Sequence, residues 1–155
     1  VLLVYADHGY SGQQGPERTA SWRRLEERVG VPARADCRVE ETHDDYDETL
    51  SAVTAALAEE PDLKYIYMAN RSVPACMEAL RRSGRMGQVR VLAHDSGPET
   101  EAFLREGLLD FIIDQNLAYQ SRKALELLFD AVVEHREPER DAFYPESPIL
   151  TAENC

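Results

Sequence analysis

Short hydrophobic runs alternate along the chain with longer stretches in which apolar residues recur every three or four positions. The runs are rich in β-branched and aromatic residues, which is typical of buried strands. The clear examples are Val1–Tyr5, Tyr65–Ala69, Val89–Ala93 and Phe111–Ile113, and a weaker one is Ala35–Val39. We therefore predict four strands, with a fifth at the weaker run.

The stretches between these runs predict amphipathic helices. Their apolar faces consist of Trp22, Leu25 and Val29; of Leu50, Val53 and Leu57; of Val73, Cys76, Met77 and Leu80; and, in the strongest pattern, of Leu125, Leu128, Phe129, Val132 and Val133. Start and stop signals agree with these positions. Ser96 and Glu99 have the spacing of a capping box around Pro98, and Gly84 and Gly107 follow helical stretches.

Strands that alternate with helices, and that are apolar on both faces, predict a parallel sheet covered by helices on both sides. We therefore expect an α/β fold of three layers, α/β/α, around a mainly parallel sheet. The βα repeats occupy residues 1–137. Residues 138–155 are polar and rich in proline, so we expect at most an edge strand or a crossing segment there.

The charge of the chain excludes one class of function. Its 155 residues include 29 acidic and 17 basic side chains, which gives a formal net charge of −12. A protein that binds nucleic acid through its phosphates needs a basic surface. We therefore expect these residues to contact neither DNA nor an anionic membrane.

The cysteines and the start of the chain bear on the cellular context. Cys37, Cys76 and Cys155 are far apart and form no C-x-x-C pair, so we expect thiols in a reducing compartment rather than disulfides or a metal site. No apolar run approaches the ~20 residues that cross a bilayer, and the first residues lack the basic start of a signal peptide. The chain opens on a strand without a preceding Met, so we expect it to be part of a longer protein.

Polar side chains follow the carboxyl ends of the clear strands, which is the edge where open α/β sheets bind ligands. They are Asp7, His8 and Tyr10 after the first strand, Asn70 after the second, His94 and Asp95 at the third, and Gln115 after the last. Each of them alone is better explained by a turn or a helix cap than by a ligand contact. Together they offer planar donors and acceptors that suit vicinal hydroxyl groups.

Arg18 adds a cation to this set. It stands in the first turn of a predicted helix, where a positive charge opposes the helix macrodipole. A ligand, an ion pair with Glu17 or Asp7, or plain solvation would each account for it.

The order and spacing of these segments resemble the C-terminal half of the type I periplasmic-binding-protein superfamily. That superfamily includes the effector domains of LacI-type transcriptional regulators and the ribose-binding-like sugar receptors. The resemblance covers nearly the whole chain, and its segments are Glu17–Trp22, Tyr65–Asn70, Arg81–Gly84, Val91–Asp95, Asp110–Asn116 and Pro148–Asn154. It implies that Arg18, Asn70, Asp95 and Gln115 hydrogen-bond a small saccharide, with His8, Tyr10 and His94 as further candidates.

The sequence departs from the family pattern in two places. Ser21–Trp22 stands where the family has Gly-Phe, and His94 stands at the usually aromatic position before the aspartate. These changes keep the class of ligand that the resemblance implies and bear on which saccharide is bound.

The leading hypothesis from the sequence is the sugar-sensing domain of a LacI-type regulator, with residues 1–137 as its C-terminal ligand-binding lobe and residues 138–155 as a closing segment. The resemblance then implies a homodimer in the cytoplasm that binds DNA only through a helix-turn-helix upstream of these residues. The alternative is an extracytoplasmic sugar-binding receptor of an ABC transporter or a chemotaxis system.

A cofactor-dependent α/β enzyme is a third hypothesis. Gly9, Gly12 and Gly15 after the first strand match neither the G-x-G-x-x-G fingerprint nor the P-loop. His8 and His94 could pair with Asp7 or Asp95, but no nucleophile or metal set accompanies them. We therefore expect a binding protein without catalytic activity, cofactor or metal.

Overall fold

The computed structural model describes residues 2–5, 38–138 and 145–155, and for residues 2–5 it describes the backbone alone. Its centre is a six-stranded sheet in the order β2-β1-β3-β4-β5-β6. The strands are β1 (Leu2–Tyr5), β2 (Arg38–Glu41), β3 (Tyr65–Ala69), β4 (Arg90–His94), β5 (Phe111–Ile113) and β6 (Ile149–Leu150). The first five are parallel, and β6 runs antiparallel to β5 at the edge.

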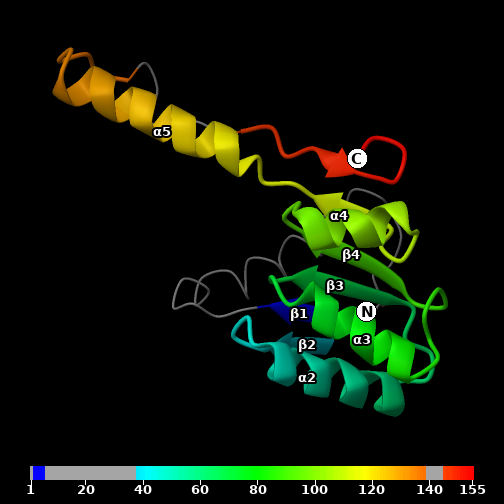
Figure 1. Cartoon of the computed structure of the whole chain (residues 1–155). Helices are drawn as coiled ribbons and strands as arrows, with labels where there is room; N and C mark the ends of the chain where they lie inside the picture. Colours follow the sequence, from blue (N-terminus) through cyan, green and yellow to red (C-terminus); the bar gives the residue numbers. More distant parts are fainter. Residues whose placement is uncertain (1, 6–37, 139–144) are drawn as a thin grey trace, which may run out of the picture.

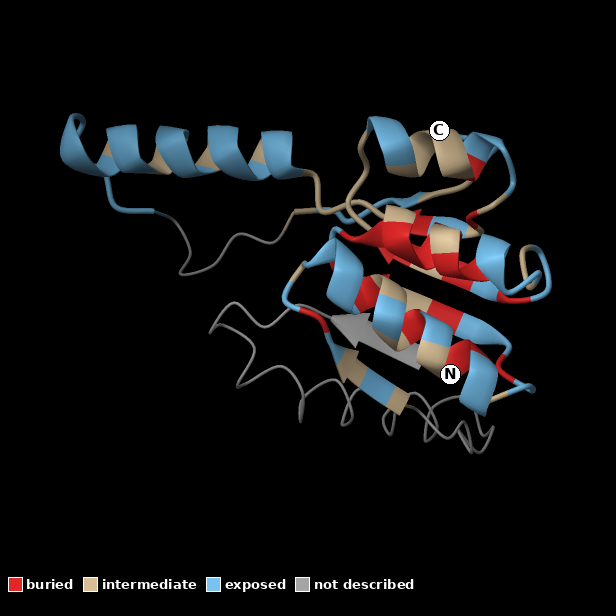
Figure 2. Ribbon diagram, turned by 60° about the horizontal axis from the view of Figure 1, so that its bottom comes forward, coloured by how far each residue is buried: buried red, intermediate tan, exposed pale blue. Residues whose placement is uncertain are grey.

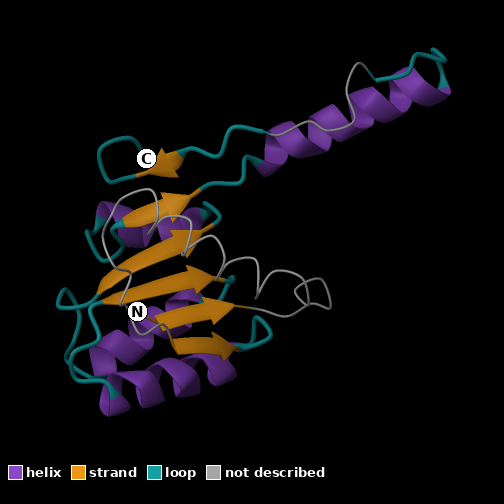
Figure 3. Ribbon diagram, turned by 180° about the vertical axis from the view of Figure 1, so that it is seen from behind, coloured by secondary structure: helices purple, strands orange, loops and turns teal. Residues whose placement is uncertain are grey.

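Four helices connect these strands within the described part of the chain. They are α2 (Tyr46–Glu59), α3 (Val73–Arg82), α4 (Pro98–Arg105) and α5 (Leu117–Val132). Figures 1 and 3 show α2, α3 and α4 on one face of the sheet, while α5 extends away from it. The α/β class and the mainly parallel sheet are confirmed.

The core lies between the sheet and these three helices. Ile66 and Met68 of β3 are buried, and they are in register with Val91 and Ala93 of β4, which are also buried. Side chains alternate between the two faces of a strand. Tyr65, next to Ile66 in β3, and Phe111, next to the buried Ile112 in β5, therefore point to the opposite face and are exposed. Figure 2 shows the buried residues gathered at the sheet and on the inner sides of the helices.

Only one face of the sheet carries helices among the residues that the structure describes. The predicted helix with Trp22, Leu25 and Val29 lies outside them, and so do residues 35–37 of the weak strand prediction. The third layer of the expected α/β/α arrangement therefore stays a prediction. The described residues contain a strand at the position of the weak prediction Ala35–Val39, namely β2 at Arg38–Glu41.

The helix ends follow the sequence signals in part. Asp45 caps α2 by accepting a hydrogen bond of 2.9 Å from the Glu48 backbone N–H, and Gly84 and Gly107 adopt φ values of 68° and 73° after α3 and α4. The predicted capping box at Ser96 is wrong. Gly97 is the N-cap of α4, and the Ser96 hydroxyl donates to Asp114 Oδ1 at 3.1 Å.

The tail returns to the sheet. Ile149 and Leu150 pair with β5, and the Asp114 backbone N–H donates to the Pro148 carbonyl at 3.0 Å. The expectation of an edge strand in this segment is therefore confirmed, whereas the proposed domain boundary at residue 137 stays a prediction.

Candidate functional site

The strand order creates a topological switch point between β1 and β3. The chain leaves β1 toward β2 on one side, and it leaves β3 toward β4 on the other side. Connections that start in opposite directions diverge between these two strands, and open α/β sheets bind ligands beyond the carboxyl ends at such a switch point. Asn70 follows β3, which is one of the two strands at this point.

The structure places four of the predicted site residues along the carboxyl edge. Asn70 follows β3, His94 ends β4, Asp95 follows β4, and Gln115 lies two residues after β5. Because β3, β4 and β5 are adjacent parallel strands, their carboxyl ends lie side by side. Arg18, His8 and Tyr10 lie outside the described residues.

Asn70 is held rigidly at this edge. Its side chain is 6% exposed, its Nδ2 group donates to Thr42 Oγ1 at 2.9 Å, and its Oδ1 atom accepts from the Ser72 backbone N–H at 3.2 Å. The Asn70 side chain therefore stabilises the loop after β3, which agrees with a structural role in a turn. A carboxamide has two N–H groups and two carbonyl lone pairs, so bonding capacity remains for a ligand.

Asp95 shows the clearest sign of a missing partner. Its Oδ1 atom is buried and makes no hydrogen bond within the described part of the chain. Its backbone φ is 64°, in the left-handed region that non-glycine residues adopt rarely. The backbone is fixed there, because the Asp95 N–H donates to the Ile113 carbonyl at 3.0 Å and its carbonyl accepts from Thr100 Oγ1 at 3.1 Å. Buried polar atoms without partners are costly, and they are typical of functional sites.

His94 contacts Tyr67 on the face of the sheet opposite the helices. The Tyr67 hydroxyl and the His94 Nε2 atom are hydrogen-bonded, and the two ring centroids are 5.3 Å apart. Both side chains are half-buried. Tyr67 was not singled out from the sequence, although the alternation along β3 places it on the same face as His94.

The loop between β5 and α5 carries Gln115 at the same edge of the sheet. Asn116 adopts a φ of 53° as the N-cap of α5, and the Gln115 carbonyl accepts from Gln120 Nε2 at 2.6 Å. Gln115 itself is half-buried. The loop therefore has a defined conformation at the position where the chain leaves the sheet for α5.

Among the described residues, no group of three or more potential ligands could hold a metal ion. No helix in that part of the chain combines the length and the apolar character that a membrane span requires.

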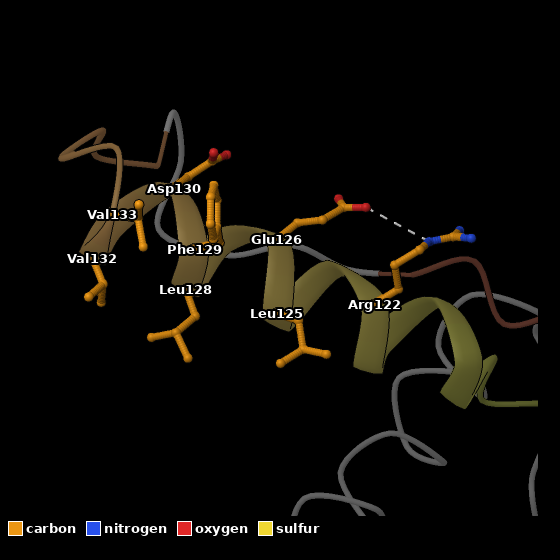
Figure 4. Close-up of a pocket in the computed structure, with 8 residues that line it drawn as sticks. All are labelled: Arg122, Leu125, Glu126, Leu128, Phe129, Asp130, Val132 and Val133. Atoms are coloured by element: carbon orange, nitrogen blue, oxygen red, sulfur yellow. Dashed lines mark ion pairs between the residues drawn. The ribbon is translucent and has the colours of Figure 1, made fainter.

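A shallow hollow beside α5 is mainly apolar and does not have the character of a saccharide-binding site. It is lined by Arg122, Leu125, Glu126, Leu128, Phe129, Asp130, Val132 and Val133. Figure 4 shows Leu125, Leu128 and Val132 on one side of the helix, while Arg122 and Glu126 pair at 3.9 Å. Its lining residues come from α5 and the C-cap Val133 alone, so its polar side chains do not converge from several elements as they do in a small-molecule site.

The family of the chain follows from comparison with known proteins. The sequence pattern of the family described as "Periplasmic binding protein domain" matches residues 22–136. This is most of the chain, and the chain therefore belongs to this family.

One curated relative is the D-ribose/D-allose-binding protein of Pseudomonas aeruginosa, which is 33% identical over 90 residues. The aligned part covers 55% of this chain and 28% of the relative. The chain thus matches little more than a quarter of that protein.

Solved structures confirm the fold, and they too are longer than this chain. An ABC transporter solute binding protein from Agrobacterium vitis, with bound D-fucose, matches 99% of this chain and 51% of its own, at a TM-score of 0.78 and 16% identity. A protein described as a LacI transcriptional regulator from Bacteroides fragilis matches 99% of this chain and 53% of its own, at 0.72 and 19%. The chain therefore corresponds to about half of each of these proteins.

Proposed function

We propose that this chain is one lobe of a sugar-binding protein and that the protein is a solute receptor of an ABC transporter. Membership of the periplasmic binding protein family supports a binding role. The curated relative is named for D-ribose and D-allose, and the matched Agrobacterium structure contains D-fucose. These names favour the receptor alternative over the regulator that the sequence first suggested.

The observation that carries the proposal is the buried, unpartnered Oδ1 atom of Asp95 at the carboxyl edge of the sheet. A carboxylate accepts hydrogen bonds and donates none, so hydroxyl groups of a saccharide are suitable partners. Asn70 supplies a donor and an acceptor on the next strand, and Gln115 lies on the other side. Arg18 and, more weakly, His8, Tyr10 and His94 complete the proposed set.

The second wall of the binding site comes from another lobe in this proposal. The matched structures are about twice as long as this chain, and α5 extends away from the sheet with an exposed apolar face. A saccharide held between two lobes loses more of its contact with water than one held on a single sheet edge.

The test is a calorimetric titration of the full-length protein with D-ribose, D-allose and D-fucose. We expect at least one of them to bind, and we expect Asp95→Ala to weaken that binding by about 100-fold or more, because hydrogen bonds to a buried charged group are among the stronger ones. The matched control is Asp110→Ala. Asp110 lies at the opposite edge of the sheet, where it pairs with Arg90 at 2.6 Å, so its loss is expected to leave the affinity unchanged.

Two results would contradict the proposal. Absence of binding for every saccharide in a wider panel would remove the sugar-binding function. An Asp95→Ala variant that binds as tightly as the parent would remove the site.

The regulator remains the second candidate because of the Bacteroides structure, which shares the fold. The homodimer, the DNA contact through an upstream helix-turn-helix and the cytoplasmic location all belong to this candidate. Fractionation of cells that express the full-length protein separates the two. Recovery outside the cytoplasm supports the receptor, and recovery with DNA in the cytoplasm supports the regulator.

A further inference from the structure

The buried hydroxyl group of Thr42 holds the Asn70 side chain in place. Thr42 follows β2 and is 1% exposed, and Thr49 lies in α2 and is fully buried. Thr42 Oγ1 accepts from Asn70 Nδ2 at 2.9 Å and from Thr49 Oγ1 at 2.8 Å. Because β1 lies between β2 and β3 in the sheet, these bonds connect two loops across the end of a third strand.

Two contacts fix which way the Asn70 carboxamide faces. The Ser72 backbone N–H can only donate, so the atom that it meets at 3.2 Å is the carbonyl oxygen Oδ1. The Nδ2 group then faces Thr42. One N–H and one carbonyl lone pair of Asn70 remain, and their directions are set by these contacts.

The loop that carries Thr42 is itself tied to the loop that carries Asn70. Asp44 Oδ1 accepts from the Arg71 backbone N–H at 2.8 Å, and the Asp44 carbonyl accepts from the Ser72 hydroxyl at 2.8 Å. His43 and Asp44 adopt φ values of 50° and 59° in succession. Left-handed conformations are unfavourable for residues other than glycine, so the surrounding contacts must maintain this loop.

We propose that Thr42 is a positioning residue for ligand binding, which orients the Asn70 carboxamide so that its remaining donor and acceptor meet the saccharide. This inference rests on the proposed function, since it takes Asn70 as a ligand contact. Thr42 itself is buried behind Asn70 and acts only through it. The loop after β2 thus contributes to the site without touching the ligand.

The first test compares three variants of the full-length protein with the parent. Thr42→Val has nearly the same shape but no hydroxyl, and we expect it to weaken saccharide binding by about 10-fold or more, because the Asn70 amide loses its partner. Thr42→Ser keeps the hydroxyl and is expected to restore most of the affinity. Thr49→Val is the matched control: it removes an equally buried hydroxyl one bond further from Asn70, so it should lower stability and keep the affinity within about threefold.

A double-mutant cycle separates positioning from general destabilisation. If Thr42 acts through Asn70, then Thr42→Val has no further effect on affinity in an Asn70→Ala background. Additive losses of affinity would overturn the proposal, and so would a Thr49→Val variant that loses as much affinity as Thr42→Val.

A measurement without ligand keeps the inference distinguishable from the proposed function. The two Asn70 Nδ2 protons are observed by NMR in the parent and in Thr42→Val. We expect one of them to shift and to exchange with water at least about 10-fold faster in the variant, because it has lost its buried acceptor. Unchanged signals would overturn the positioning role, whereas failure of every saccharide to bind, with the signals shifted as expected, would overturn only the proposed function.

Discussion

Helices α3 and α5 are both amphipathic, yet the apolar face of α3 is buried and that of α5 is exposed. α3 has ten residues and buries Val73, Ala75, Cys76, Met77, Ala79 and Leu80 against the sheet and α2. α5 has sixteen residues and buries none, with Leu125, Leu128 and Phe129 all more than half exposed. The difference shows that an apolar stripe predicts a helix and a contact face, but not where the partner of that face lies.

The largest expected difference between the two helices is in thiol reactivity. Burial raises the pKa of the Cys76 thiol in α3 to about 12, and only the thiolate is reactive. In a Cys37→Ser, Cys155→Ser background, we expect a cysteine introduced in α5 as Leu125→Cys to be labelled by a thiol reagent at least about 1000-fold faster than Cys76, whose labelling requires opening of the core. Peptide mapping by mass spectrometry measures both rates.

Urea provides the control for this comparison, because both thiols should react at similar rates once the chain is unfolded. Rapid labelling of Cys76 in the native protein would contradict the burial of α3 in the core. Slow labelling of Leu125→Cys would contradict the exposure of α5 by showing that its face is covered.

The second difference concerns the free energy of unfolding. Leu80 in α3 is fully buried, so Leu80→Ala should destabilise the 155-residue chain by about 3 kcal/mol through lost burial and a residual cavity. Leu125 in α5 is 68% exposed, so Leu125→Ala should cost less than about 0.5 kcal/mol. Urea unfolding followed by circular dichroism measures both changes.

The same pair of variants in the full-length protein tests whether a second lobe covers α5. If a second lobe covers α5, the cost of Leu125→Ala should rise there, while the cost of Leu80→Ala should stay the same. Equal and small costs of Leu125→Ala in both forms would contradict the two-lobe arrangement.

The predictable part of this fold is the part governed by local patterns. The strand at Tyr65–Ala69 follows from its apolar, β-branched and aromatic run, and α2 follows from the helical spacing of Leu50, Val53 and Leu57; both lie where the sequence places them. The exposure of α5 was not predictable, because it depends on long-range contacts and not on the residues of the helix. Ser96 was misread for a similar reason: a tertiary partner, Asp114, takes the hydroxyl that a local pattern assigned to a cap.

The site was predictable as a set of positions and not as a network. Asn70, Asp95 and Gln115 could be placed at the carboxyl edge because strand ends in a parallel sheet share one edge. Thr42 could not be found, since a threonine at a strand end carries no signal of its own. Its role appears only when the strand order brings the loops after β2 and β3 together.

The smallest expected effect is a pH dependence on the surface of α3. Glu78 accepts hydrogen bonds from Arg81 and Arg82 at 2.7 to 2.8 Å, and these hold the pKa of Glu78 below its ordinary value of 4.5. A lowered pKa in the folded state stabilises the protein above the unfolded pKa, and this contribution is lost as the pH falls through the lowered value. The urea midpoint of the parent should therefore exceed that of Glu78→Gln between about pH 5 and pH 7, and the gap should close in more acidic buffer.

Glu126→Gln in α5 is the control. Its ion pairs with Arg122 and Lys123 are longer, 3.9 and 3.3 Å, and exposed pairs contribute little, so its midpoint should move less at pH 7. A gap for Glu78→Gln that stays constant into acid would show that the carboxylate charge is not what stabilises α3.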